Sequence, residues 1–260
     1  CALPISPAAP YGGPEAFRRF IDAAHAAGVA VILDVVYNHL GPDGNYLGLF
    51  SPRYTTPRHK TPWGDALNFD DRGSEYVRGF FTENLLHWIH EYHIDGFRLD
   101  ATHEIADDSP RHILGELKDA AAAHPRGGHV AYLTAETHEN DRRYLLPRPE
   151  GFGFDAVWAD DFHHGVRTIL HAEREGYLGG FAGTAAELAR TIRQGWLYEG
   201  QCAPGTDEAR GTPADGLAWT SFVYCIQNHD QVGNRALGLR LNTTAGLGDF
   251  AAASALLLLL

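Results

Sequence analysis

Residues 94–103 read Ile-Asp-Gly-Phe-Arg-Leu-Asp-Ala-Thr-His, and this stretch indicates the fold class of the chain. Side chains alternate between the two faces of a strand, so Phe97 and Leu99 share one face. The opposite face carries Arg98 and Asp100. A charged side chain on an apolar strand is costly to bury unless it is paired or functional. The stretch therefore predicts a buried strand with chemistry at its carboxyl end.

Similar apolar runs recur along the chain and alternate with stretches of helical periodicity. This alternation is typical of a parallel sheet with helical crossovers, whose strands are covered on both faces. Ser109 and Pro110 predict the start of one helix, and Gly28 predicts the end of another. The predicted strands are residues 30–36, 96–101, 130–136, 156–160 and 221–226. The predicted helices are residues 14–27, 74–92, 110–124 and 184–198.

Polar residues follow each predicted strand at its carboxyl end. In parallel α/β barrels, catalytic residues gather at that end of the strands. One acidic strand end alone is explained by a helix N-cap or a solvated loop, but five such ends favour a functional site. The stretches concerned are residues 34–39, 98–100, 134–136, 160–164 and 227–230.

The composition fits one large globular domain and excludes several classes of protein. The chain has 260 residues, of which 44% are hydrophobic, and three are cysteines. These values exclude a disordered or disulfide-dense chain. The formal net charge of −12 opposes binding to nucleic acid and to anionic membranes, so we expect neither as a partner. The few cysteines favour a reducing compartment, and we expect a cytoplasmic protein.

Both ends of the sequence predict a piece of a longer protein. The chain contains no methionine, begins with Cys1 and ends within the apolar run 250–260. That run is shorter than the roughly 20 residues of a membrane-spanning helix, so we expect a helix of the core. An open five-stranded sheet would expose its edges, and we expect residues 1–260 alone to be insoluble or inactive.

Residues 40–73 interrupt the alternation of strands and helices with a stretch rich in Gly, Pro, Asp, Tyr and His. Loops of this length are usually functional or disordered. The aromatic residues in it, such as Trp63, favour an ordered insertion or small subdomain. Residues 202–216 predict a second loop that is exposed to solvent.

Four short motifs resemble the conserved regions of the α-amylase superfamily of glycoside hydrolases, in the order of that family. The resemblance implies an α/β fold that is a partial TIM (β/α)8 barrel of roughly strands 3 to 7, with residues 40–73 inserted after strand 3. It implies that residues 1–260 are an incomplete catalytic barrel. It also implies that an N-terminal β-domain, barrel strands 1, 2 and 8 and a C-terminal β-domain are absent from the chain. The motifs are Asp-Val-Val-Tyr-Asn-His at 34–39, Gly-Phe-Arg-Leu-Asp-Ala at 96–101, Ala-Glu at 135–136 and Asn-His-Asp at 228–230.

The resemblance implies the catalytic roles of three carboxylates. Asp100 corresponds to the nucleophile and Glu136 to the general acid and base of a retaining glycosidase, whose two carboxyl groups lie about 5–5.5 Å apart. Glu136 then needs a raised pKa to carry a proton near neutral pH. Asp230 corresponds to a third carboxylate that binds sugar hydroxyls and stabilises the transition state.

The same resemblance implies further site residues. Arg98 would keep Asp100 ionised, because a nearby cation favours a charged carboxylate. Asp34 and Asn38 are expected to support the site structurally, Asp34 by pairing with Arg98. The residues expected to bind substrate are His39, Arg98, His229, Trp63, His103, Asp161 and His164.

A finer resemblance is to the maltooligosyltrehalose trehalohydrolases. It covers residues 59–70, 95–103, 160–164 and 227–235, and it implies hydrolysis of the α-1,4 bond next to the terminal trehalose of maltooligosyl trehalose. Branching enzymes of the same superfamily generally have Phe-Asn-Tyr-Gly and His-Asp-Glu, where this chain has Asn68-Phe-Asp70 and His229-Asp-Gln231. A 1,4-α-glucan branching enzyme and an inactive fragment remain the alternatives.

We expect no cofactor and no catalytic metal. The adjacent His163 and His164 should point apart on any regular element, and no His-Glu-x-x-His motif occurs in the sequence. The expected partner is maltooligosyl trehalose or a related α-glucan. The sequence leaves the oligomeric state open.

Overall fold

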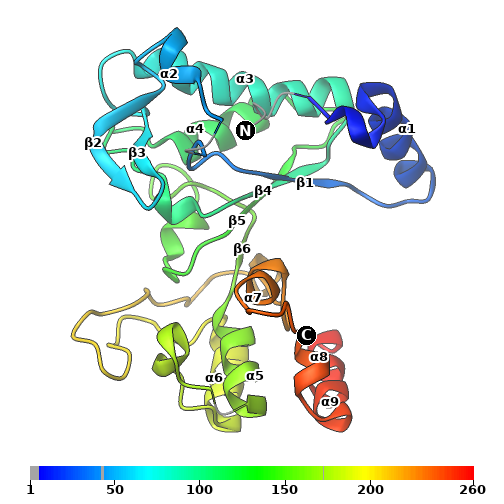
Figure 1. Cartoon of the computed structure of the whole chain (residues 1–260), viewed down its shortest axis with the longest axis vertical. Helices are drawn as coiled ribbons and strands as arrows, with labels where there is room; N and C mark the ends of the chain where they lie inside the picture. Colours follow the sequence, from blue (N-terminus) through cyan, green and yellow to red (C-terminus); the bar gives the residue numbers. More distant parts are fainter. Residues whose placement is uncertain (1–5, 42–43, 172) are drawn as a thin grey trace. The chain divides into compact units, whose positions relative to one another are not determined.

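The computed structural model describes residues 6–41, 44–171 and 173–260 (Figure 1). The chain divides into two compact units, each described here by itself. Its five parallel strands follow the order β1-β4-β5-β6-β7. Unit 1 comprises Cys1–Glu136 and Arg143–Ala156, and unit 2 comprises Thr137–Arg142 and Val157–Leu260.

The sheet of unit 1 has β4 at its centre, paired in parallel with β1 on one side and β5 on the other. Arg98 on β4 is in register with Asp34 on β1 and with Thr134 on β5. A Cβ on Gly96 would lie 2.6 Å from the carbonyl oxygen of Tyr132, so only glycine fits there. These strands are β1 (Ile32–Val35), β4 (Gly96–Leu99) and β5 (Tyr132–Ala135).

Burial differs between these strands. Every residue of β4 is buried, as the sequence predicts. The run 30–36 was also expected to be a buried strand, but this expectation is wrong for β1, in which Ile32 is 52% exposed. The physical reason is that β1 is an edge strand, paired on one side only among the described residues.

The helices of unit 1 are close to the predictions, and α3 matches at both ends. It buries Val77, Phe81 and Leu85, and packs against α4 (Figure 1). The predicted start of α4 at Pro110 is wrong, because the helix begins after His112, whose ring accepts a hydrogen bond from the amide of Leu114. The α-helices are α1 (Gly13–Ala26), α3 (Ser74–Tyr92) and α4 (Ile113–Ala123), and the 3-10 helices are Ala9–Tyr11, Thr102–Glu104 and Arg142–Tyr144.

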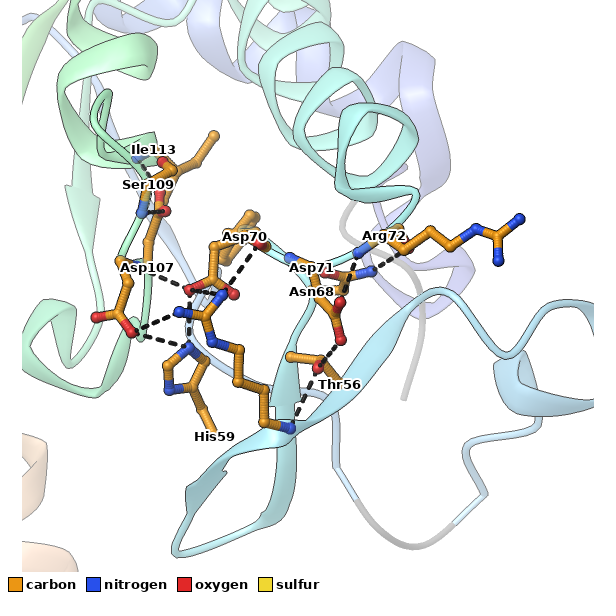
Figure 2. Close-up of polar contacts among 12 residues, drawn as sticks. Thr56, His59, Asn68, Asp70, Asp71, Arg72, Asp107, Ser109 and Ile113 are labelled. Carbon is orange, nitrogen blue, oxygen red and sulfur yellow. Dashed lines mark hydrogen bonds and ion pairs between the residues drawn. The ribbon is translucent and has the colours of Figure 1, made fainter.

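The insertion after β1 is an ordered hairpin rather than an irregular loop. It contains α2 (Leu47–Phe50) and the antiparallel strands β2 (Thr55–Thr61) and β3 (Gly64–Leu67). Figure 2 shows how polar contacts hold its base: Thr56 donates to Asp71, and the ring of His59 lies 2.8 Å from Asp70.

Unit 2 packs α5 against α6 and pairs two short parallel strands, with Val157 opposite Phe222. Its core includes Phe162, Val166 and Leu188. The strands are β6 (Ala156–Trp158, whose first residue lies in unit 1) and β7 (Phe222–Val223). The helices are α5 (Asp161–His171), the 3-10 helix Gly176–Gly180, α6 (Ala185–Gln194), the 3-10 helix Trp219–Ser221, α7 (His229–Gly233), α8 (Leu241–Thr244) and α9 (Leu247–Leu258).

One of two expectations for unit 2 needs correction. The predicted helix 184–198 is capped by Thr184 but ends at Gln194, because Gly195 has a φ of 97° and a Cβ there would lie 2.4 Å from the Phe222 ring. The apolar run 250–260 is helical as far as Leu258 and contributes to the core, as expected, although α9 buries only Ala253. Phe250, Leu256 and Leu257 are partly buried and pack against the same cluster. Among the described residues, no helix combines the length and hydropathy required to cross a membrane.

The cap of α4 makes stability depend on pH. Burial lowers the pKa of His112 from its ordinary 6.5 to about 4, and its neutral ring accepts the capping hydrogen bond. Since the folded-state pKa is depressed, the stabilisation is present above pH 6.5 and is lost as the pH falls toward 4. We expect urea unfolding to show a loss of about 2 kcal/mol between pH 7 and 4.5 from this group.

The matched variant is His112→Asn, which keeps a capping acceptor but does not titrate. It should show a smaller decrease of the unfolding free energy over the same range. Equal pH dependence in both proteins would show that His112 does not cause the effect.

Candidate active site

A single guanidinium organises the carboxylates at the strand ends of unit 1. Nη1 of Arg98 lies 2.7 Å from Oδ1 of Asp34 and 2.8 Å from Oδ1 of Asp100. Nη2 lies 2.6 Å from Oε2 of Glu136. Burial alone would lower the pKa of Arg98, but the hydrogen bond to Asp34 and the three carboxylate charges raise it above its ordinary value. Arg98 is therefore a permanent cation shared by three strands' ends, and the expected contacts of Arg98 with Asp34 and Asp100 are present.

Asp100 is held from a second side by Asn38. The Asn38 side-chain amide donates to Oδ2 of Asp100 at 2.8 Å and to its backbone carbonyl at 2.6 Å. Arg98 and Asn38 thus bind different oxygens of one carboxylate, which fixes its plane. The Asp100 side chain remains 23% exposed, so a ligand can reach it.

Glu136 is positioned by a strained turn that immediately follows Asp100. Ala101 has a φ of 38°, in the left-handed region that costs a non-glycine residue about 1–2 kcal/mol. This conformation aims the amide of Ala101 at Oε2 of Glu136, 2.7 Å away, while the Thr102 amide and hydroxyl donate to the Glu136 carbonyl. Sequence reasoning did not identify Ala101, because an alanine gives no signal of left-handed backbone.

His39 and Trp63 form an aromatic face in the same unit. Their rings are stacked, with centroids 3.9 Å apart and an angle of 7° between the planes. Burial lowers the pKa of His39, and the charge of Asp100 opposes that shift. Trp63 lies on the hairpin turn between β2 and β3 and is 38% exposed. His103 lies just beyond Asp100 on a 3-10 turn, 3.9 Å from Glu104, and is partly exposed.

The remaining predicted residues lie in unit 2. His229 and Asp230 open α7, where their side chains are 65% and 43% exposed. Asn228 caps this helix in a reciprocal capping box. Its side chain accepts a hydrogen bond from the backbone of the first turn, and its backbone amide donates to the side chain of Gln231. Gln231 therefore has a local structural function at a position where a glutamate would cap equally well.

Asp161 is a structural hub, and the expectation that it binds substrate is not supported by its burial. Its side chain is fully buried. One oxygen pairs with Arg210 at 2.7 Å, and the other accepts from Asn140 at 2.7 Å and from the Leu197 amide at 2.8 Å. These donors satisfy the carboxylate within the protein. Sequence reasoning did not identify Arg210 or Asn140, which come from loops without periodic pattern.

The loop 202–216 was expected to be exposed. Residues 204–209 are exposed, but the part that follows them is held by hydrogen bonds to residues 138–140. Arg210 donates to the carbonyl of His138, and the backbone amide and hydroxyl of Thr212 both donate to the carbonyl of Asn140. This anchoring creates a polar cavity of about 490 Å³ in unit 2. Its polar lining comes from His138, Glu139, Asp141, Glu208, Arg210 and Thr212.

His163 and His164 are buried at the start of α5 and do not point apart as expected. Their rings lie with centroids 4.2 Å apart at an angle of 73°, because the first helical turn lets both rings swing to one side. Burial lowers the pKa of His164 well below its ordinary value, so its imidazole is neutral. His164 also packs on Tyr177 and Phe181.

The carboxylates around Arg98, at the ends of neighbouring parallel strands, are those that the first three motifs predict. No model of a protein family matches the chain. A crystal structure of an inferred alpha amylase from Salmonella typhimurium is similar, with a TM-score of 0.84 and 40% sequence identity over 93% of this chain and 41% of that chain. The chain belongs to the α-amylase superfamily of glycoside hydrolases.

Within that superfamily the chain is similar to malto-oligosyltrehalose trehalohydrolases. It is 47% identical to the protein of that name from Deinococcus radiodurans over 257 residues, which is 97% of this chain and 41% of the relative. A 1,4-alpha-glucan branching enzyme from Nitratidesulfovibrio vulgaris is 32% identical over 178 residues, 66% of this chain and 23% of the relative. The chain spans about two fifths of the length of the trehalohydrolases that it matches.

The expected fold class is confirmed by these comparisons and by the strand order. Five parallel strands alternate with helices as in the α-amylase barrels, and the described residues form no closed barrel. The resemblance seen in the motifs at 34–39 and 96–101 thus extends over nearly the whole chain.

The buried pair of Asp161 and Arg210 gives a prediction for stability. Asp161→Asn removes the fully buried carboxylate and leaves Arg210 without its charged partner. We expect the free energy of unfolding to fall by about 3 kcal/mol. Urea denaturation followed by circular dichroism measures it.

Asp207→Asn is the control, because it removes the same charge from the exposed part of the loop and should change stability by less than about 0.5 kcal/mol. If the two variants are equally stable, Asp161 is not a structural hub.

Proposed function

We propose that this chain carries the catalytic residues of a retaining glycosidase that cleaves the α-1,4 bond next to the terminal trehalose of maltooligosyl trehalose and releases trehalose. The observation that supports it most is the pairing of Asp100 and Glu136 with one buried guanidinium at adjacent strand ends. A nucleophile and an acid/base from neighbouring strands are what this reaction requires. The similarity to trehalohydrolases supports the choice of substrate.

In the proposed mechanism, Asp100 attacks the anomeric carbon while the glycosidic bond breaks, and Glu136 gives its proton to the leaving oxygen. Water then loses a proton to Glu136 and attacks the anomeric carbon, which releases Asp100. Arg98 and Asn38 hold Asp100 oriented for the first step. Oε2 of Glu136 contacts the Ala101 amide and the Arg98 guanidinium, which fix the orientation of this carboxyl group at the site.

The other residues have supporting roles in this proposal. The neutral His39 and the Trp63 ring offer a hydrogen-bonding and stacking face for a sugar. Asp230 and His229 are exposed on α7 and are proposed to bind sugar hydroxyls, on the strength of their motif. His103 and His164 remain proposed substrate-binding residues on the same ground.

The polar cavity of unit 2 is proposed to bind part of the oligosaccharide. Carboxylates, an imidazole and Arg210 line it, and such groups can both donate to and accept from sugar hydroxyls. A neutral, hydroxyl-rich ligand also fits the acidic balance of the chain. The free thiols Cys202 and Cys225 fit a reducing compartment, and we propose a cytoplasmic location.

A branching enzyme is the second candidate, supported by the similarity to one such protein over 178 residues. The two candidates share the same carboxylates and differ in the product. Incubation of the purified protein with maltotriosyl trehalose separates them, because a trehalohydrolase forms free trehalose and a branching enzyme forms new branch points.

The nucleophile is tested by Asp100→Asn. An amide oxygen is too weak a nucleophile to form the glycosyl-enzyme, so we expect trehalose release to fall by at least about 10⁴-fold with oligosaccharide binding retained. The measurements are trehalose formation and calorimetric binding of maltotriosyl trehalose.

Asp22→Asn on the exposed face of α1 is the matched control and should keep normal activity. Near-normal hydrolysis by Asp100→Asn would remove Asp100 from the nucleophile role. A protein that releases only glucose or maltose would instead contradict the proposed substrate.

The stacking face is tested by Trp63→Ala. Loss of a stacking interaction of about 1 kcal/mol should raise KM about fivefold and leave kcat nearly unchanged, because binding is lost equally in the ground and transition states. Trp219→Ala, at a 63% exposed position of unit 2, is the control and should leave KM unchanged. Unaltered KM in Trp63→Ala would exclude the indole from the substrate site.

A further inference from the structure

Three side chains at the start of α5 bring metal-ligand atoms together. Asp160, His163 and His164 each offer one ligand atom, and these atoms lie within 4.8 Å of one another. Nε2 of His163 is 3.3 Å from Oδ1 of Asp160. For bonds of about 2.1 Å, the edge of a tetrahedral zinc site is about 3.4 Å, so this pair already has the separation of two ligands of one ion.

The imidazoles in this group have no partners that would explain their burial. The His163 side chain is 2% exposed, and neither of its ring nitrogens has a hydrogen-bond partner, since the contact with Asp160 lacks hydrogen-bond geometry. Nδ1 of His164 is likewise buried without a partner. A buried polar group without a hydrogen bond costs about 1–3 kcal/mol, and native proteins rarely leave several together. The unsatisfied nitrogens therefore point to a ligand.

We propose that Asp160, His163 and His164 bind a divalent transition-metal ion, with Zn²⁺ the best match. Two imidazoles and one carboxylate suit Zn²⁺, while Ca²⁺ and Mg²⁺ prefer oxygen ligands alone. His163 and His164 lie in the first turn of α5, and Asp160 directly precedes the helix, so the three residues have the spacing i, i+3 and i+4 that brings side chains together. The Asp160 side chain is 20% exposed, so the ion can enter from that side and keep a water as fourth ligand.

The surrounding charges are compatible with a cation. Arg167 and Arg210 are the nearby cations, but each is neutralised by its own carboxylate: Arg167 lies 2.8 Å from Glu173, and Arg210 lies 2.7 Å from Asp161. Asp160 thus remains the carboxylate available to the ion. The site would fasten the first turn of α5 and stabilise unit 2. It would give His164 a structural role in place of the substrate contact proposed from its motif.

A second group in the chain also offers ligand atoms but already contacts a protein cation. His59, Asp70 and Asp108 also place ligand atoms within 4.8 Å of one another. Figure 2 shows the first two of these residues close together. There, however, the Arg58 guanidinium lies 3.6 Å from Asp70 and 3.1 Å from Asp108, so one protein cation already contacts both carboxylates. This group serves as the internal comparison for the metal-binding experiment.

The experiment is a titration of the EDTA-treated, dialysed protein with Zn²⁺, followed by calorimetry, and with Co²⁺, followed by visible absorption. We expect one ion per chain, intense Co²⁺ bands typical of four-coordination, and a higher melting temperature with Zn²⁺. Asp160→Asn should weaken Zn²⁺ binding at least 10- to 100-fold, as should His163→Gln. The Asp160 variant alters a partly exposed side chain, so it remains informative if the His163 variant fails to fold.

Two controls distinguish this site from incidental binding. His59→Gln alters the other group, and Asp207→Asn removes an exposed charge of unit 2; both should bind Zn²⁺ like the unaltered protein. Absence of stoichiometric binding, or binding that Asp160→Asn leaves unchanged, would overturn the proposal and leave buried water as the partner of these imidazoles. Loss of binding in His59→Gln instead of Asp160→Asn would assign the ion to the other group.

Discussion

The guanidinium of Arg98 is the constraint on which unit 1 depends, because it is a buried charge that three strand ends must neutralise together. Its side chain is 5% exposed and contacts Asp34, Asp100 and Glu136. A buried cation is tolerated only with its counter-ions in place, and removing one of them leaves an uncompensated charge. The parallel register of β1, β4 and β5 brings those carboxylates to one edge, so sheet and site require the same arrangement.

Unit 2 has a corresponding constraint of opposite sign. The fully buried carboxylate of Asp161 collects Arg210, Asn140 and two backbone amides from separate segments. Gly211 beside it is required sterically, since a Cβ would lie 1.9 Å from the Tyr198 carbonyl oxygen. In both units a single buried charge determines where the loops after the strands lie, and those loops carry the polar groups of the proposed sites.

Some elements were readable from the sequence because local preference and tertiary packing agree. The helix 74–92 was predicted at its observed bounds, and the strand at 96–101 lies where alternating apolar residues place it. The start of α4 was misplaced because two caps competed: Asp107 accepts from the amides of both Ser109 and Ile113, which holds Ser109 in a turn ahead of the helix. The insertion was recognised but not its hairpin, since β2 contains charged residues that give no apolar alternation.

The sequence by itself determined the class of fold, the family and the candidate catalytic carboxylates, because motifs at strand ends are local patterns with fixed order. Only the tertiary structure decided the function of single side chains within those motifs. Neighbours such as Asp160 and Asp161 look equivalent in the sequence. Asp160, however, is partly exposed and lies beside two imidazoles, whereas Asp161 is fully buried and pairs with Arg210. The turn at Ala101 likewise depends on the distant Glu136, and burial and partners of this kind come from residues far apart in the chain.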